Sequence, residues 1–104
     1  MSDQSKINKL IRENGYLIAD GATGTNLFAM GLESGYPPEL WNLEKPENVA
    51  KNHKSFIDAG SDIILTNSFG ANKFRLKLHG AQDETYIINY SAAEIANNVA
   101  KKSN

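Results

Sequence analysis

The stretch FIDAGSDIILTNSFG, residues 56–70, decides the expected fold. Its first part continues a run with helical spacing, and Gly60 stands where a helix commonly ends. Residues 62–66, DIILT, follow as a short apolar run without alternation, which is typical of a parallel strand covered on both faces. Small polar residues and a glycine come next, and we expect them to form the loop that leaves the strand.

A second segment has the same design. YLIAD, residues 16–20, predicts a buried strand that ends in an acid and is followed by two glycines. Apolar spacing predicts helices over residues 5–14, around 26–30, from 46 to about 60, from about 71 to 78, and after residue 83. Strands that alternate with helices favour a parallel α/β sheet. Two strands cannot cover both of their faces, so residues 1–104 are expected to be one domain that is incomplete at its C-terminus.

The composition excludes several functional classes. Eleven Lys and Arg residues nearly balance twelve Asp and Glu residues, which leaves no basic surface for nucleic acid or an anionic membrane. No apolar run approaches the roughly 20 residues of a membrane-spanning helix, and the polar N-terminus is unlike a signal peptide, so a cytoplasmic location is expected. The chain has no cysteine, which excludes disulfides, a cysteine nucleophile and a zinc site built on its own thiolates.

The loop DGATGT, residues 20–25, matches neither glycine-rich phosphate motif, and no lysine follows it. Ligands bind at the carboxyl ends of strands in parallel α/β folds, so Asp20 and residues 66–68 are expected to face one pocket. The Asp20 carboxylate suits an ammonium group, and the N–H groups around residues 21–25 suit a carboxylate, which together favour an amino acid. A simple Asp-Gly turn and two ordinary loop starts are the alternative interpretation.

Three further features have two interpretations each. Trp41 follows two prolines and is either a hydrophobic plug or an aromatic wall, which would attract an onium group by about 0.5–2 kcal/mol. His53 lies on an apolar stripe, which favours a core histidine bonded to a carbonyl over a ligand. Lys73, Arg75 and Lys77 are typical of a solvated helix face, with a phosphate site as the lesser alternative.

Several of these motifs together resemble the homocysteine S-methyltransferases. The motifs DGA-x-GT, PPE-x-WN, AGSDI and LTN-x-FG occur in order, and the resemblance runs from about residue 16 to residue 100. It is strongest to bacterial betaine–homocysteine methyltransferases and to the homocysteine-binding domain of cobalamin-dependent methionine synthase. The fold that this implies is a TIM (β/α)8 barrel, of which the chain would be the N-terminal portion with two parallel strands and flanking helices.

The resemblance also implies a chemistry and a set of site residues. In the family, a zinc ion held by three cysteines activates the homocysteine thiol, which takes a methyl group from a donor and gives methionine. By position, the residues that resemble the homocysteine site are Asp20, Gly21, Thr66, Asn67, Ser68 and Phe69, and Trp41 resembles the residue that faces the methyl donor. Gly70 stands where the animal betaine enzymes have a tyrosine, so the donor is betaine, another onium compound or a methyl-carrying cofactor.

Three hypotheses follow from the sequence. The chain is an N-terminal fragment of a zinc-dependent methyltransferase, with the zinc ligands outside it and no activity of its own. Alternatively, it binds a small amino acid or onium compound without chemistry. In the third hypothesis, it is a partial barrel that is completed by a homo-oligomer or by another chain.

Overall fold

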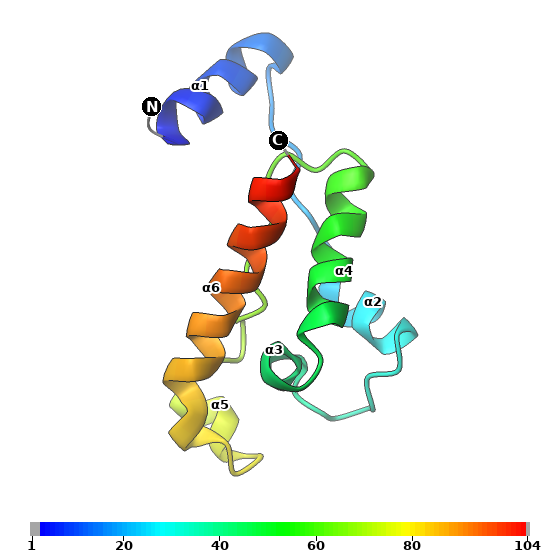
Figure 1. Ribbon diagram of the computed structural model, residues 1–104, viewed down its shortest axis with the longest axis vertical. Coiled ribbons are helices and arrows are strands. Elements are labelled where there is room, and N and C mark those ends of the chain that lie inside the picture. The colour runs from blue at the N-terminus through cyan, green and yellow to red at the C-terminus, as the bar shows by residue number, and fades with distance from the viewer. Residues whose placement is uncertain (1–2, 104) are drawn as a thin grey trace.

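The computed structural model describes residues 3–103, and nearly all of its regular structure is helical (Figure 1). The elements, in chain order, are α1 (Asp3–Asn14), α2 (Thr23–Ala29), the 3-10 turn η1 (Pro38–Leu40), α3 (Trp41–Glu44), α4 (Pro46–Asp58), α5 (Lys73–Lys77), the 3-10 turn η2 (Gln82–Glu84) and α6 (Thr85–Lys102). The two longest helices of the described part are α4 and α6, and they stand side by side with α3 across their lower ends (Figure 1).

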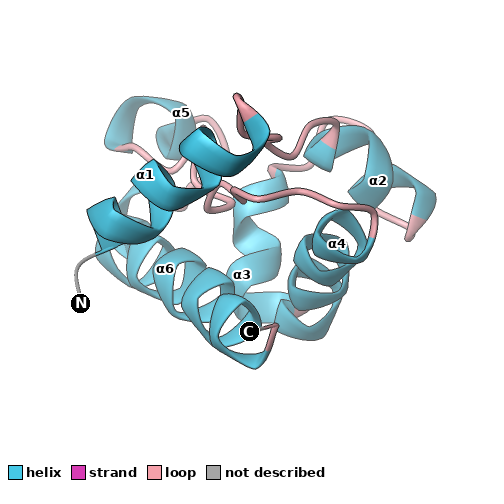
Figure 2. Cartoon of the chain, turned by 90° about the horizontal axis from the view of Figure 1, so that it is seen from above, coloured by secondary structure: helices cyan, strands magenta, loops and turns pink. Residues whose placement is uncertain are grey.

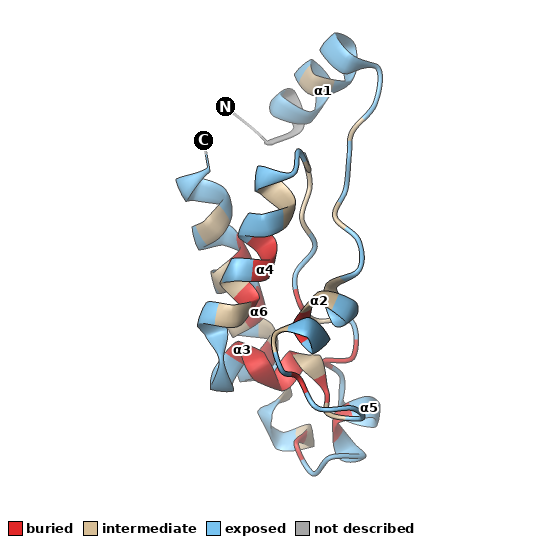
Figure 3. Cartoon of the chain, turned by 90° about the vertical axis from the view of Figure 1, so that its right-hand side faces the viewer, coloured by how far each residue is buried: buried red, intermediate tan, exposed pale blue. Residues whose placement is uncertain are grey.

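The core lies where α3, α4 and α6 meet, and α1 stands apart from it (Figure 3). One cluster of buried side chains joins α2, α3 and α4, and another joins the end of η1 to α5 and α6. Tyr36 packs against both clusters. The members of the first cluster are Leu27, Leu32, Trp41 and Val49, and those of the second are Leu40, Ala71, Leu76, Ala81 and Ile88. The connection before α3 therefore ties the two parts of the core together.

The prediction of strands at residues 16–20 and 62–66 is wrong. The predicted two-stranded portion of a TIM barrel, which depends on those strands, is therefore wrong as well. Both segments are loops within the described chain (Figure 2), and their pairing consists of one isolated parallel bridge between Ala19 and Ile63. Three backbone hydrogen bonds hold the bridge: the Asp20 N–H donates to the Ile63 carbonyl, and the N–H groups of Asp62 and Ile63 both donate to the Ile18 carbonyl.

The physical reason for this correction is the missing cover on both segments. A strand becomes stable when neighbouring strands satisfy its backbone and other elements bury its side chains. Here Ile18 is 46% exposed and Leu65 is 65% exposed, and none of the apolar residues that predicted buried strands is buried. A single pair of short segments gains too little from burial to extend its ladder beyond one bridge.

The helical predictions hold where a helix can satisfy its own backbone. Pro46 begins α4, and the chain leaves this helix through Gly60, whose positive φ of 111° is easily adopted only by glycine. On α6, the predicted stripe is buried at Ile88 and Ala92. No helix within residues 3–103 has both the length and the apolar character that a membrane crossing requires.

Candidate functional site

A cavity of about 640 Å³ lies where the two bridged segments end. Residues 35–39 before α3 form one further wall, and the C-terminal part of α5 with the turn after it forms another. All six residues predicted to contact homocysteine line it, namely Asp20, Gly21, Thr66, Asn67, Ser68 and Phe69. The structure therefore brings these residues together around one space, whereas their roles toward a ligand stay predictions.

Asp20 has one carboxylate oxygen engaged and one available. Its Oδ2 accepts a hydrogen bond from the Leu65 backbone N–H at 3.1 Å, which fixes the side chain across the two bridged segments. Its Oδ1 has no hydrogen-bond partner among the residues that the structure describes. A carboxylate held in this way is oriented before a ligand arrives, which reduces the entropy lost on binding.

A clasp between two buried amides holds the wall that carries residues 65–70. The Asn67 Nδ2 donates to the Asn42 Oδ1 at 3.0 Å and to the Pro38 carbonyl at 3.0 Å. In return, the Asn42 Nδ2 donates to the Asn67 carbonyl at 2.8 Å and to the Ile88 carbonyl on α6 at 3.2 Å. Both side chains are buried. Asn67 thus lines the cavity while its amide group holds the loop in place.

Glu39 fixes the other end of the same loop. Its Oε2 accepts the Gly70 backbone N–H at 3.0 Å, and the residue is only 7% exposed. Two acids, Asp20 and Glu39, therefore anchor residues 65 and 70 by their backbone N–H groups, and both line the cavity. The sequence analysis did not predict the roles of Glu39 and Asn42, although both belong to the motif PPE-x-WN. Nothing in a proline-rich connection indicates which of its polar residues turn inward.

The loop between these anchors presents small hydroxyls and one aromatic ring. Thr66 Oγ1 and Ser68 Oγ lie 2.6 Å apart and share a hydrogen bond. Phe69 is 88% exposed, and the Arg75 guanidinium lies over its ring, 5.6 Å from the centroid. Arg75 and His79 also line the cavity, so its wall combines two acids, one arginine, hydroxyls and an aromatic face.

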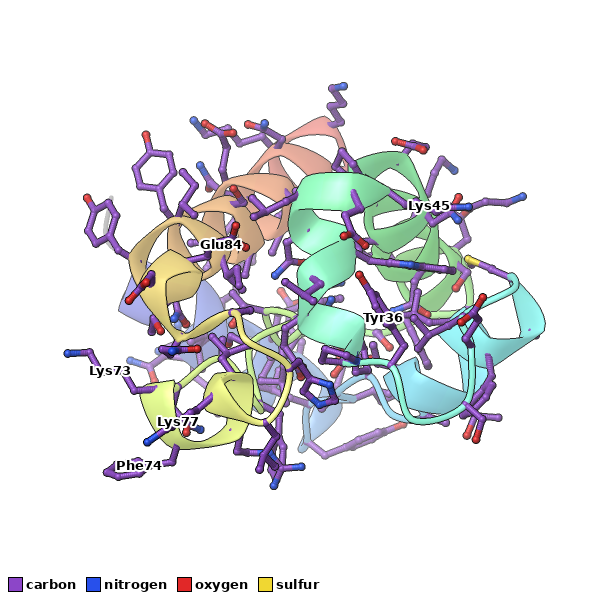
Figure 4. All side chains as sticks on the ribbon, turned by 90° about the horizontal axis from the view of Figure 1, so that it is seen from below. Tyr36, Lys45, Lys73, Phe74, Lys77 and Glu84 are labelled. Carbon is purple, nitrogen blue, oxygen red and sulfur yellow. The ribbon has the colours of Figure 1, made fainter. Side chains whose placement is uncertain are left out.

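Tyr36 contributes a phenol whose proton is committed to a carboxylate. Its hydroxyl donates to Glu44, with 2.7 Å to Oε1 and 2.8 Å to Oε2. This hydrogen bond, followed by burial and by the negative charge of Glu44, raises the pKa of Tyr36 to about 12. Figure 4 shows Tyr36 near the centre of the molecule beside the chain that enters α3.

The pKa of Tyr36 leads to a testable pH dependence. The folded phenol holds its proton up to about pH 12, whereas an unfolded tyrosine releases it near pH 10, so this interaction stabilises the fold fully below pH 10 and is lost between pH 10 and 12. A ¹³C NMR titration of the Tyr36 Cζ resonance should give a midpoint near 12, and Glu44→Gln should move it toward 10. A midpoint near 10 in the unsubstituted chain would contradict the hydrogen bond.

Trp41 lies away from the cavity. It is 4% exposed and packs in the core with Leu27 and Val49. The ammonium of Lys45, labelled in Figure 4, lies 5.4 Å from its ring centroid and occupies an indole face. This placement matches the interpretation of Trp41 as a hydrophobic plug, and its role toward a methyl donor stays a prediction.

The remaining candidates divide between core and surface. His53 is fully buried, and within the described residues neither ring nitrogen has a hydrogen-bond partner, so the predicted bond to a carbonyl is absent. Burial lowers the pKa of His53 and so favours the neutral ring, and this effect outweighs the negative charge of Asp20, which acts in the opposite direction. Lys73 and Lys77 are exposed and project outward from α5 (Figure 4), as expected for a solvated face.

No metal site can be assembled from these residues. Within the part of the chain that the structure describes, no three His, Asp or Glu side chains are grouped so that they could hold an ion, and the sequence has no cysteine. The donor set therefore does not fit the zinc site that the family resemblance implies.

Comparison with known proteins identifies relatives over nearly the whole chain. The profile of a family described as homocysteine S-methyltransferase matches residues 17–104. The methionine synthase of Mycobacterium tuberculosis (strain ATCC 25618 / H37Rv) is 30% identical over 92 residues, which cover 81% of this chain and 8% of the relative. The methionine synthase of Mycobacterium leprae (strain TN) is 29% identical over 92 residues with the same coverage. The chain thus spans about 8% of the length of these curated relatives.

Proposed function

The chain belongs to the homocysteine S-methyltransferase family, and we propose that its cavity is part of the pocket that holds homocysteine while a methyl group is transferred to the thiol. The observation that carries this proposal is the available Oδ1 of Asp20, which lies in a cavity with the five other predicted contacts. The volume of about 640 Å³ falls within the roughly 300–1,000 Å³ that is typical of small-molecule sites.

In this proposal, Asp20 binds the ammonium group of homocysteine. The ammonium donates to the free carboxylate oxygen in a charge-assisted hydrogen bond, which is stronger than a neutral one. The hydroxyls of Thr66 and Ser68 offer further donors or acceptors, since each rotates to suit its partner. The polar end of the amino acid is thereby fixed, and its thiol is directed away from Asp20.

The reaction that we propose for the whole enzyme is a nucleophilic displacement. The deprotonated sulfur attacks the methyl carbon of an onium donor, betaine or a related compound, and an S–C bond forms as the donor C–N or C–S bond breaks. The bond pair stays on the donor heteroatom, which becomes neutral, and the product is methionine. A zinc ion supplies the thiolate in the family by lowering the thiol pKa. Because the residues of this chain do not fit a zinc site, we derive no step through it.

Binding without methyl transfer is therefore the expected behaviour of the 104-residue chain. Calorimetric titration with L-homocysteine should give saturable heat, and incubation with homocysteine and betaine should give no methionine above the rate without protein. If no binding heat is observed, the proposal is rejected. The same result would reject the alternative that the chain is a non-catalytic protein that binds an amino acid. Methionine formation by the purified chain would show that the thiol is activated without cysteine ligands.

A further inference from the structure

Glu39 is the buried acid of the cavity, and half of its carboxylate is unused. The Gly70 N–H engages Oε2, whereas Oε1 has no hydrogen-bond partner among the described residues. The residue lines the cavity although it is only 7% exposed. A carboxylate in this environment keeps a strong attraction for a cation, because little water is available to screen its charge. The loop needs only one oxygen of Glu39, and the other remains for a ligand.

Gly70 lies close to the side chains of both Glu39 and Arg75. A Cβ atom added at Gly70 would lie 3.1 Å from Glu39 Oε1 and 3.2 Å from Arg75 Nε. The carboxylate and the guanidinium therefore flank the same point above the glycine, but no ion pair joins these two side chains within residues 3–103. A side chain at this position would fill the gap that separates the two charges. With glycine there, both charges remain available to something that enters the cavity.

The chemistry of the gap selects one class of ligand. A ligand with only a positive charge would be attracted by Glu39 but repelled by Arg75. A ligand with only a carboxylate would be attracted by Arg75 but repelled by Glu39. A small zwitterion satisfies both groups, with its positive centre toward Glu39 and its carboxylate toward Arg75. The exposed Phe69 ring, which already stacks under Arg75, adds an apolar face for methyl groups.

We propose that Glu39 recognises the positive charge of the second substrate, a small zwitterion whose cationic centre carries the methyl group, while Arg75 receives its carboxylate. This assignment rests on the proposed function, in which the cavity holds homocysteine at Asp20. It makes Glu39 a residue that determines donor specificity from the wall of the cavity. It also gives Gly70 a purpose, because a larger residue there would close the gap.

The test compares two ligands that differ in one atom. Glycine betaine and 3,3-dimethylbutyrate have the same shape and the same carboxylate, but a quaternary nitrogen in the first is a neutral carbon in the second. NMR titration of the full 104-residue chain should give a dissociation constant about tenfold lower for betaine. Glu39→Gln keeps a carbonyl oxygen for the Gly70 N–H, and it should reduce this preference to about twofold or less. Glu94→Gln, at an exposed position on α6, is the matched control and should keep the preference.

Several results would overturn the assignment. These are no betaine binding, equal affinities for the two ligands in the unsubstituted chain, or a preference that survives Glu39→Gln. If circular dichroism shows that Glu39→Gln does not fold, the ¹³Cδ resonance of Glu39 in the unsubstituted chain replaces it: betaine should shift this resonance and 3,3-dimethylbutyrate should not. Homocysteine titration separates the two proposals. If the chain binds homocysteine but does not prefer betaine, only the role of Glu39 is rejected. If the chain does not bind homocysteine, the proposed function is rejected, and the assignment of the second substrate is rejected with it.

Discussion

Replacing Asn42 with alanine is expected to lower the free energy of unfolding by about 2–4 kcal/mol. Asn42 is 3% exposed, and its amide links the loop at Asn67 to the Ile88 carbonyl on α6. Its removal takes a hydrogen bond from the carbonyls of Asn67 and Ile88 and from one N–H of the Asn67 amide. Leaving buried polar groups without a partner is more costly than the loss of the bonds themselves. For a chain of this length, the total is about 5–15 kcal/mol, so the loss is a large fraction of the stability.

One further variant separates the hydrogen bonds of Asn42 from its packing, and a second variant is a surface control. Asn42→Asp keeps the size but replaces a donor with an acceptor that faces two carbonyl oxygens, so it should destabilise the chain at pH 7 at least as much as alanine does. Asn98→Ala, at an exposed position on α6, should change the stability by less than about 0.5 kcal/mol. Urea unfolding followed by circular dichroism measures all three. An Asn42→Asp variant as stable as the unsubstituted chain would show that the clasp contributes little.

Asp20→Asn is expected to weaken homocysteine binding by about 10- to 100-fold, because a hydrogen bond to a charged group contributes about 1.5–3 kcal/mol. The substitution removes the charge but leaves a side-chain oxygen that still accepts the Leu65 N–H, so the geometry of the two bridged segments should persist. Calorimetry of the substituted chain gives the change in affinity directly.

Asp62→Asn is the matched control for this experiment. Asp62 accepts the Ile18 backbone N–H with its Oδ2 at 3.0 Å, so it supports the same bridge from outside the cavity. Its substitution should leave the homocysteine affinity unchanged within about twofold. If the two variants weaken binding equally, the effect of Asp20 comes from the bridge and the proposed contact with the ammonium group is rejected.

The sequence predicted the helices well because a helix satisfies its own backbone and shows its buried stripe in its spacing. The helix that begins at Pro46 and the stripe through Ile88 and Ala92 are examples. Residues 16–20 and 62–66 have the composition of buried strands, but a strand depends on neighbours that composition does not describe. Within the described chain, those segments find only each other, and one bridge results.

The candidate site divides in a similar way. Asp20 and residues 66–68 could be predicted to line one cavity because they follow two apolar runs, and small polar residues at such ends are recognisable in the sequence. Gly21 and Phe69 were added only by the family resemblance. Glu39 and Asn42 could not be predicted, because their burial depends on how a connection with two prolines folds back over the loop at residues 67–70. Two interpretations of Trp41 followed from the sequence, and its packing in the core matches the hydrophobic plug, while its role toward a methyl donor stays a prediction.

The central claim is that the available oxygen of Asp20 binds the ammonium group of homocysteine, and one calorimetric cycle tests it most directly. The unsubstituted chain and Asp20→Asn are each titrated with homocysteine and with 4-mercaptobutyrate, which lacks the amino group. We predict that removing the amino group weakens binding about tenfold or more in the unsubstituted chain and hardly at all in Asp20→Asn, because the two changes delete the same interaction. Equal losses in both chains would contradict the claim, since the ammonium group and Asp20 would then act independently.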